Sequence, residues 1–216
     1  GLTRNSSATV GWEPSSDPGG SGLAGYEIEA YSGDNMTATT LPPSARSSSH
    51  PGEDGREYQY RVRAFDRAGN RGPWSSNASV LFDRSPPTPL TGIRSTVQGS
   101  RIEWSWSSSS DEASGLSGYL VSVGTTPGAA DVENRWFTRT ANFTIVGQPG
   151  ATYYLTAAVV DAAGNEGGPY SSEGGATVPN VQSAGPTDYT IWILLLAVAA
   201  VAVWWIRSSK GKVGGS

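Results

Sequence analysis

His50 is the single histidine of this 216-residue chain, and it stands among many serines and aspartates. A serine hydrolase needs such a histidine as the base beside a serine nucleophile and an orienting carboxylate. However, no serine stands in the G-x-S-x-G pattern that exposes the nucleophile of α/β-hydrolases. His50 lies in the segment SSSHPGEDG, whose composition is typical of a turn. We therefore predict no catalytic residue and interpret His50 as a solvated loop residue.

Four aspartates recur at matching places in the two halves of the chain and are candidate calcium ligands: Asp17, Asp66, Asp111 and Asp161. Calcium needs several oxygens at about 2.4 Å, usually from closely spaced carboxylates as in D-x-D-x-D-G. Each of these aspartates instead stands almost alone beside glycine and serine, which is typical of Asx-turns that fix a loop backbone. The sequence predicts no metal or cofactor site and leaves calcium binding undecided.

Glycine-rich segments also recur, as SGLAGY and SGLSGY and as DRAGNRG and DAAGNEG. A phosphate-binding loop requires a helix whose N-terminus faces the phosphate. Alternating apolar residues, typical of a strand, follow here instead. These glycines are therefore predicted to lie in hairpins and bulges.

Four asparagines stand in N-x-S/T sequons and are candidate N-glycosylation sites: Asn5, Asn35, Asn77 and Asn142. Glycosylation of such a sequon takes place on the surface of an exported protein. The sequons therefore predict a glycoprotein wherever the source cell has the machinery.

The composition limits the class of protein. With no cysteine, the chain has neither disulfides nor thiolate metal sites. The net charge of −4 and the scattered basic residues exclude nucleic acid as a partner. The 28 glycines and 14 prolines favour many short strands joined by turns over a helical bundle.

The chain contains one unit twice. The landmarks Trp12, Ser21 and Asp66 return as Trp106, Ser114 and Asp161, at offsets of 94, 93 and 95 residues. Three landmarks in one order and at one period indicate a tandem duplication. Within each copy, apolar residues alternate with polar ones, which predicts strands with one buried face. Short alternating strands separated by turns over about 95 residues predict a β-sandwich.

Both copies resemble fibronectin type III domains of microbial surface and secreted proteins. The resemblance lies in a tryptophan near the end of the second strand and in a tyrosine that begins the sixth strand, after a proline-glycine turn in the second copy and Asp54-Gly55 in the first. The corresponding residues, taken as the core signature, are Trp12, Tyr58, Trp106 and Tyr153. The resemblance implies an immunoglobulin-like sandwich and a tyrosine corner, whose hydroxyl bonds to upstream backbone. In the second copy, Ser85–Pro89 is expected to begin the opening edge strand, which the first copy lacks.

Residues 189–206 read YTIWILLLAVAAVAVWWI, eighteen positions without charge, proline or glycine. As a helix this segment would be about 27 Å long, close to the thickness of a bilayer's hydrocarbon core. Arg207, Lys210 and Lys212 follow at once, and excess basic charge marks the cytoplasmic side. The sequence therefore predicts a single-pass anchor that contacts the lipid bilayer, with the N-terminus outside the cell and the C-terminus in the cytoplasm.

These inferences divide the chain into five parts: domain 1 with a truncated first strand (1–83), domain 2 (84–178), a stem (179–188), the transmembrane helix (189–206) and a cytoplasmic tail (207–216). The predicted fold class is all-β, two tandem fibronectin type III-like sandwiches followed by one helix. The predicted function is a non-catalytic extracellular stalk, adhesion or interaction module that contacts proteins or glycans at the cell surface. The alternative is the spacer and anchor of a secreted hydrolase whose catalytic domain lies upstream. The motifs PWSS (73–76) and WSW (104–106) lack the full WSxWS spacing, which disfavours a cytokine receptor.

Overall fold

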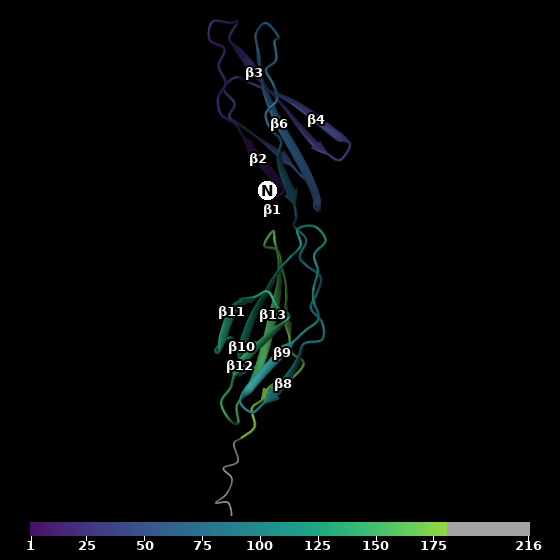
Figure 1. Ribbon diagram of the computed structural model, residues 1–216, viewed down its shortest axis with the longest axis vertical. Helices are drawn as coiled ribbons and strands as arrows, with labels where there is room; N and C mark the ends of the chain where they lie inside the picture. The colour runs from purple at the N-terminus through teal and green to yellow at the C-terminus, as the bar shows by residue number, and fades with distance from the viewer. Residues whose placement is uncertain (181–216) are drawn as a thin grey trace, which may run out of the picture. The chain divides into compact units, whose positions relative to one another are not determined.

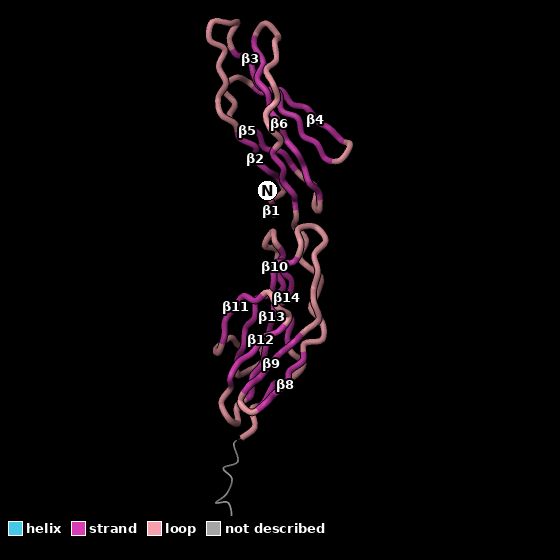
Figure 2. The backbone as a smooth tube through the Cα atoms, in the orientation of Figure 1, coloured by secondary structure: helices cyan, strands magenta, loops and turns pink. Residues whose placement is uncertain are grey.

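Residues 1–180 are described by the computed structural model, and their regular structure consists of strands, β1 to β15 (Figures 1 and 2). The prediction of an all-β, fibronectin type III-like fold is confirmed for this part of the chain. Within it there is no helix of the length and apolarity that a membrane crossing requires. The predicted transmembrane helix at 189–206 and the tail at 207–216 lie outside the described residues.

The strands of the first copy form two sheets. The larger has the order β1-β7-β6-β3-β4, and the smaller pairs β2 with β5. The bounds of these strands are β1 Leu2–Thr3, β2 Ser7–Gly11, β3 Leu23–Ser32, β4 Asn35–Leu41, β5 Ser47–Pro51, β6 Arg56–Asp66 and β7 Ala78–Phe82. All pairs are antiparallel except that of β1 with β7, which is parallel.

The strands of the second copy repeat this plan with several differences. The larger sheet has the order β11-β10-β13-β14, with β15 also pairing with β13, and the smaller sheet has three strands, β12-β9-β8. The bounds are β8 Arg94–Gln98, β9 Arg101–Ser105, β10 Leu116–Gly124, β11 Glu133–Thr138, β12 Asn142–Val146, β13 Thr152–Asp161, β14 Glu166–Ser171 and β15 Ala176–Thr177. Strand β8 has no counterpart beside β2, where the smaller sheet of the first copy has two strands.

The core of each sandwich lies between its two sheets. In the second copy, Trp104 of the smaller sheet and Leu155 of the larger sheet are fully buried in one hydrophobic cluster. In the first copy, Trp12 next to β2 packs against Tyr26 of β3, with ring centroids 5.4 Å apart. Burial along β13 alternates residue by residue, as the period of two in the sequence predicts. Full burial of each Leu or Val side chain contributes about 1.5–3 kcal/mol.

The recurrent glycines lie in turns and bulges, as predicted. Gly69 and Gly164, in the hairpins that follow β6 and β13, have φ values of 90° and 86°. This left-handed region is open to glycine without the steric cost that a Cβ brings. Gly25 and Gly118 lie where the strand register shifts, and a Cβ at either would come within 2.5 Å of a carbonyl oxygen of the neighbouring strand.

The prediction that His50 lies in a solvated loop was wrong. This residue lies in strand β5 rather than in a turn, and its ring packs against Tyr60 of β6 with centroids 5.0 Å apart. Burial alternates along β5, with Ser48 and His50 at the less exposed positions, since alternate residues of a strand face opposite sides. The ring is therefore partly buried between the sheets, and its Nε2 has no hydrogen-bond partner among the described residues.

The expected edge strand of the second copy is β8, but it begins at Arg94 and not in Ser85–Pro89 as predicted. The segment is instead held by separate backbone bonds, from Thr88 N to Ser110 O (2.8 Å) and from Ser107 N to Thr91 O (2.9 Å). Proline has no N–H to donate to a sheet, so the prolines prevent a continuous ladder here. The segment thus follows the loop between β9 and β10 without becoming part of the sheet.

Candidate functional site

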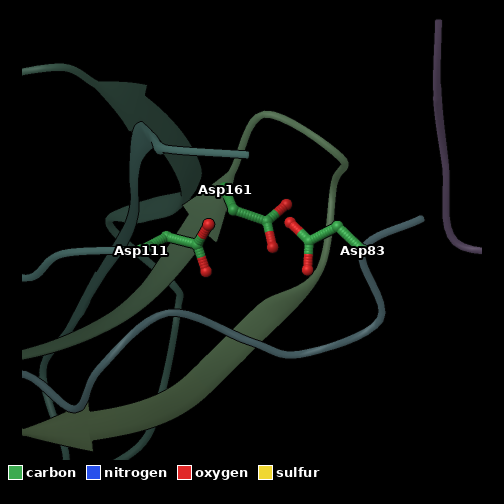
Figure 3. Close-up of side chains that lie close together, drawn as sticks. All are labelled: Asp83, Asp111 and Asp161. Carbon is green, nitrogen blue, oxygen red and sulfur yellow. The ribbon is translucent and has the colours of Figure 1, made fainter. Parts of the chain in front are cut away.

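Three aspartates from distant parts of the chain meet in one cluster: Asp83, Asp111 and Asp161. Their nearest carboxylate oxygens all lie within 4.8 Å of one another, and the three side chains point toward a common centre (Figure 3). Asp83 directly follows β7, Asp111 lies in the loop between β9 and β10, and Asp161 ends β13. Among the described residues this is the one group of three or more potential metal ligands.

Asp161 is held by the hairpin that follows it. Both of its carboxylate oxygens accept hydrogen bonds from Asn165, Oδ1 from the backbone N–H (2.8 Å) and Oδ2 from the side-chain amide (2.7 Å). The same amide nitrogen also donates to the carbonyl oxygens of Asp83 (3.0 Å) and Ser85 (3.3 Å). Asn165 therefore ties the segment after β7 to the hairpin after β13.

Asp111 fixes its own loop, as predicted for an Asx-turn. Its Oδ1 accepts three backbone hydrogen bonds, from Ala113 (3.1 Å), Ser114 (2.8 Å) and Gly115 (2.9 Å). All of these bonds engage Oδ1, and among the described residues no donor is bonded to Oδ2.

Asp83 is the member that the sequence analysis did not select. Its side chain has no exposed surface, and while Oδ1 accepts a bond from Ser85 N (3.2 Å), Oδ2 is buried with no hydrogen-bond partner. Asp161 is only 1% exposed. No ion pair within 4.0 Å joins a described lysine, arginine or histidine to any of the three aspartates. Burying carboxylates without a partner of opposite charge is costly.

The first copy has the matching pair of aspartates without a third. Asp66 binds Asn70 as Asp161 binds Asn165, and Oδ2 of Asp17 accepts a bond from Gly22 N (2.9 Å). The hydrogen bond from the Asn70 amide holds the pKa of Asp66 below its usual range. In the described structure no further carboxylate joins this pair within the same distance.

The predicted core signature residues face the interior of the two sandwiches. Trp106 and Tyr153 are each 6% exposed, and Trp12 and Tyr58 are partly buried. The hydroxyl of Tyr58 accepts a hydrogen bond from Glu53 N (3.2 Å), and that of Tyr153 accepts one from Gln148 N (2.9 Å). Each tyrosine thus fixes the backbone five residues upstream.

The four sequon asparagines are all exposed. Asn5 lies in the loop before β2 and Asn77 in the loop before β7, while Asn35 and Asn142 are the first residues of β4 and β12. Each side chain is therefore accessible to a glycan, and glycosylation stays a prediction.

A ladder of charges covers the outer face of the first copy's larger sheet, and the sequence analysis missed it. Arg61 pairs with Glu29 (2.6 Å) and Arg63 with Glu27 (2.7 Å) across β6 and β3. The Trp74 ring lies against both guanidinium groups, with its centroid 4.6 Å from Arg61 and 4.2 Å from Arg63. The hydrogen bond from Arg63 lowers the pKa of Glu27. Arginines at every second position of β6 were the feature of the sequence that could have predicted this ladder.

These features define a class of protein: tandem immunoglobulin-like sandwiches, each with a tyrosine that anchors the turn before its sixth strand. Residues 2–80 match the family model of the fibronectin type III domain, and this part of the chain is such a domain.

Two solved structures are similar to the chain. Domains A168–A170 from titin give a TM-score of 0.59 at 18% identity, covering 83% of this chain and 61% of that one. The FN1–FN3 domains of chicken CNTN1 give 0.54 at 20%, covering 83% and 64%. At these identities the likeness shows the fold alone.

Three curated relatives are similar in sequence. Exoglucanase B of Cellulomonas fimi is 30% identical over 177 residues, 78% of this chain. Chitinase A1 of Niallia circulans is 33% identical over 132 residues, 58% of the chain, and Endoglucanase B of Cellulomonas fimi is 39% identical over 97 residues, 45% of the chain. The chain spans 15%, 18% and 9% of the length of these relatives, respectively.

Proposed function

We propose that the chain is the non-catalytic spacer of a larger extracellular protein, in which fibronectin type III-like domains separate a hydrolase domain from the cell surface. The observation that carries this proposal is the match to two glucanases and a chitinase over less than a fifth of their length. A module shared by enzymes named for different substrates serves a role that is independent of the substrate. Because function belongs to sites rather than to folds, the proposal rests on this match and not on the sandwich itself.

The location proposed for this spacer is the outer face of the cell membrane. The apolar segment 189–206 would cross the bilayer, and the basic residues after it would remain in the cytoplasm. The test is to express the chain with and without residues 189–206 and separate the cell fractions. We expect the 216-residue chain to resist carbonate extraction and to be cut by protease added outside the cell. Its release by carbonate would contradict the anchor.

The spacer role is tested by comparing two proteins: the 216-residue chain and the longer chain of the source organism that contains it. The 216-residue chain alone is expected to release no soluble sugar from cellulose or chitin, whereas the longer chain that contains it is expected to do so. Deleting residues 1–178 from the longer chain should leave hydrolysis of a soluble oligosaccharide unchanged and slow hydrolysis of the solid substrate. Hydrolysis by the 216-residue chain alone would contradict the proposal.

A second candidate function, adhesion to a surface glycan, is favoured by two exposed aromatic residues. Trp136 and Phe137 of β11 are 57% and 44% exposed, although large aromatic side chains usually bury most of their surface. Exposed aromatic residues on a strand can stack on sugar rings. Retention of the chain on insoluble cellulose or chitin, lost on Trp136→Ala but not on Val146→Ala, would support adhesion. Val146 is the matched control because it is 77% exposed in the same copy.

A further inference from the structure

We propose that Asp83, Asp111 and Asp161 together bind a calcium ion, which joins the segment after β7 to the loops of the second copy. The inference does not depend on the proposed spacer role. The three carboxylates lie within 4.8 Å of one another, and Asp83 and Asp161 are almost completely buried. Like charges at this distance in a poorly solvated site repel strongly.

The protein itself supplies no counter-charge for the cluster within the described residues. Arg4 donates to the carbonyl oxygen of Gly164 (2.6 Å), and Arg84, which follows Asp83 in the chain, donates to that of Gly52 (3.2 Å). Asn165 contributes a neutral amide, which fixes Asp161 without balancing its charge. A bound cation would provide the missing compensation.

A second observation points independently to a ligand. Oδ2 of Asp83 is buried and has no donor, although buried polar atoms in proteins are nearly always hydrogen-bonded. Figure 3 shows this carboxylate directed toward Asp161. An unpartnered carboxylate oxygen that faces two other carboxylates is in the position of a metal ligand.

The chemistry of the donors selects calcium. All three side chains offer oxygen, and neither histidine nor cysteine takes part, which disfavours zinc and copper. Calcium accepts an irregular set of six to eight oxygens, including backbone carbonyls and water, whereas magnesium demands a nearly ideal octahedron at shorter distances. Three loops with different backbone geometries suit the more tolerant ion.

Calcium binding to the 216-residue chain is measured by titration calorimetry after removal of metals with EGTA. We expect one site with a dissociation constant of about 10⁻⁴–10⁻³ M, as in extracellular calcium modules. About 10 mM CaCl₂ should raise the melting temperature of one unfolding transition by several degrees, since a ligand bound only to the folded state stabilises it. An equal effect of MgCl₂ would overturn the choice of calcium, and no effect of either ion would overturn the site.

The variant Asp83→Asn separates ion binding from a merely structural role. It should weaken calcium binding at least tenfold, and in EGTA it should melt at a higher temperature than the parent chain because one buried charge is removed. A residue with only a structural role would instead lower the melting temperature in both buffers. Asp111→Asn should weaken binding in the same way.

Asp17→Asn and Asp66→Asn are the matched controls from the corresponding loops of the first copy. Asp66 accepts the same two hydrogen bonds from Asn70, and Asp17 accepts one from Gly22 N. Both should leave calcium binding unchanged. Loss of binding in either control, or full binding in Asp83→Asn, would overturn the proposal.

Discussion

The hairpins after β6 and β13 have the same local structure in different surroundings. In each, an aspartate binds the backbone and side-chain amide of an asparagine four residues later, around a glycine with positive φ. The hairpin at Asp66 is exposed, whereas the side chain of Asn165 also holds the backbone of Asp83. The repeated sequence therefore forms the same turn twice, and Asp83, which lies outside the repeated motif, makes the second turn part of a candidate site.

The two copies also differ in how their cores are filled, and this difference predicts the largest mutational effect. Trp104 has no exposed surface, while Val10, at the matching position of the first copy, is only partly buried. Trp104→Ala should destabilise the second copy by about 3–5 kcal/mol through the cavity it leaves. Val10→Ala should cost about 1 kcal/mol, the average for a point substitution. Urea unfolding followed by circular dichroism measures both, and equal costs would contradict the comparison.

The two tyrosine corners offer a finer contrast. Tyr153→Phe removes the acceptor of a 2.9 Å bond at a buried site, and the N–H of Gln148 is left without its partner. This should cost about 1–2 kcal/mol. Tyr58→Phe removes a longer bond at a more exposed site and should cost about 0.5–1 kcal/mol. A larger loss for Tyr58→Phe in the same unfolding experiment would reverse the expected order.

The charge ladder belongs to the first copy, and its removal should affect only that copy. Trp74→Ala removes the ring that lies against Arg61 and Arg63, and each exposed cation–π contact is worth about 0.5–1 kcal/mol. The second copy has Thr156 and Ala158 in place of the arginines, so its unfolding should be unchanged. The loss of stability caused by Trp74→Ala should be nearly the same in high salt, because the contact with Arg61 and Arg63 also buries part of the Trp74 ring. A shift in the second copy's transition would show that the copies are coupled.

The smallest expected effect concerns pH and His50. Burial lowers the pKa of His50, so the folded state binds a proton more weakly than the unfolded state. Stability is therefore full above the unfolded pKa of about 6.5 and declines as the pH falls below it. Melting between pH 8 and pH 5 should show this decline for the first copy, and His50→Gln should reduce it. The second copy has no histidine, and an identical decline there would assign the effect to other groups.

Much of the fold could be predicted because it depends on local sequence. The period of two along β13 predicts a strand, and the repeated glycines predict turns. The tandem landmarks predict two copies of one domain. The candidate site could not be predicted, because Asp83 meets Asp161 across 78 residues of chain. Its position has no distinctive motif, and its burial arises only when the segment after β7 packs beside the second hairpin. His50 was misplaced for a related reason: its turn-like neighbours concealed a short strand.

Hydrogen–deuterium exchange with and without calcium tests the contrast between the two hairpins most directly. The account predicts that about 10 mM CaCl₂ slows amide exchange in residues 161–167 and around Asp83, while residues 66–72 exchange at the same rate in both buffers. Equal protection of the two hairpins, or none in either, would contradict the claim that Asp83 makes the second one a calcium site.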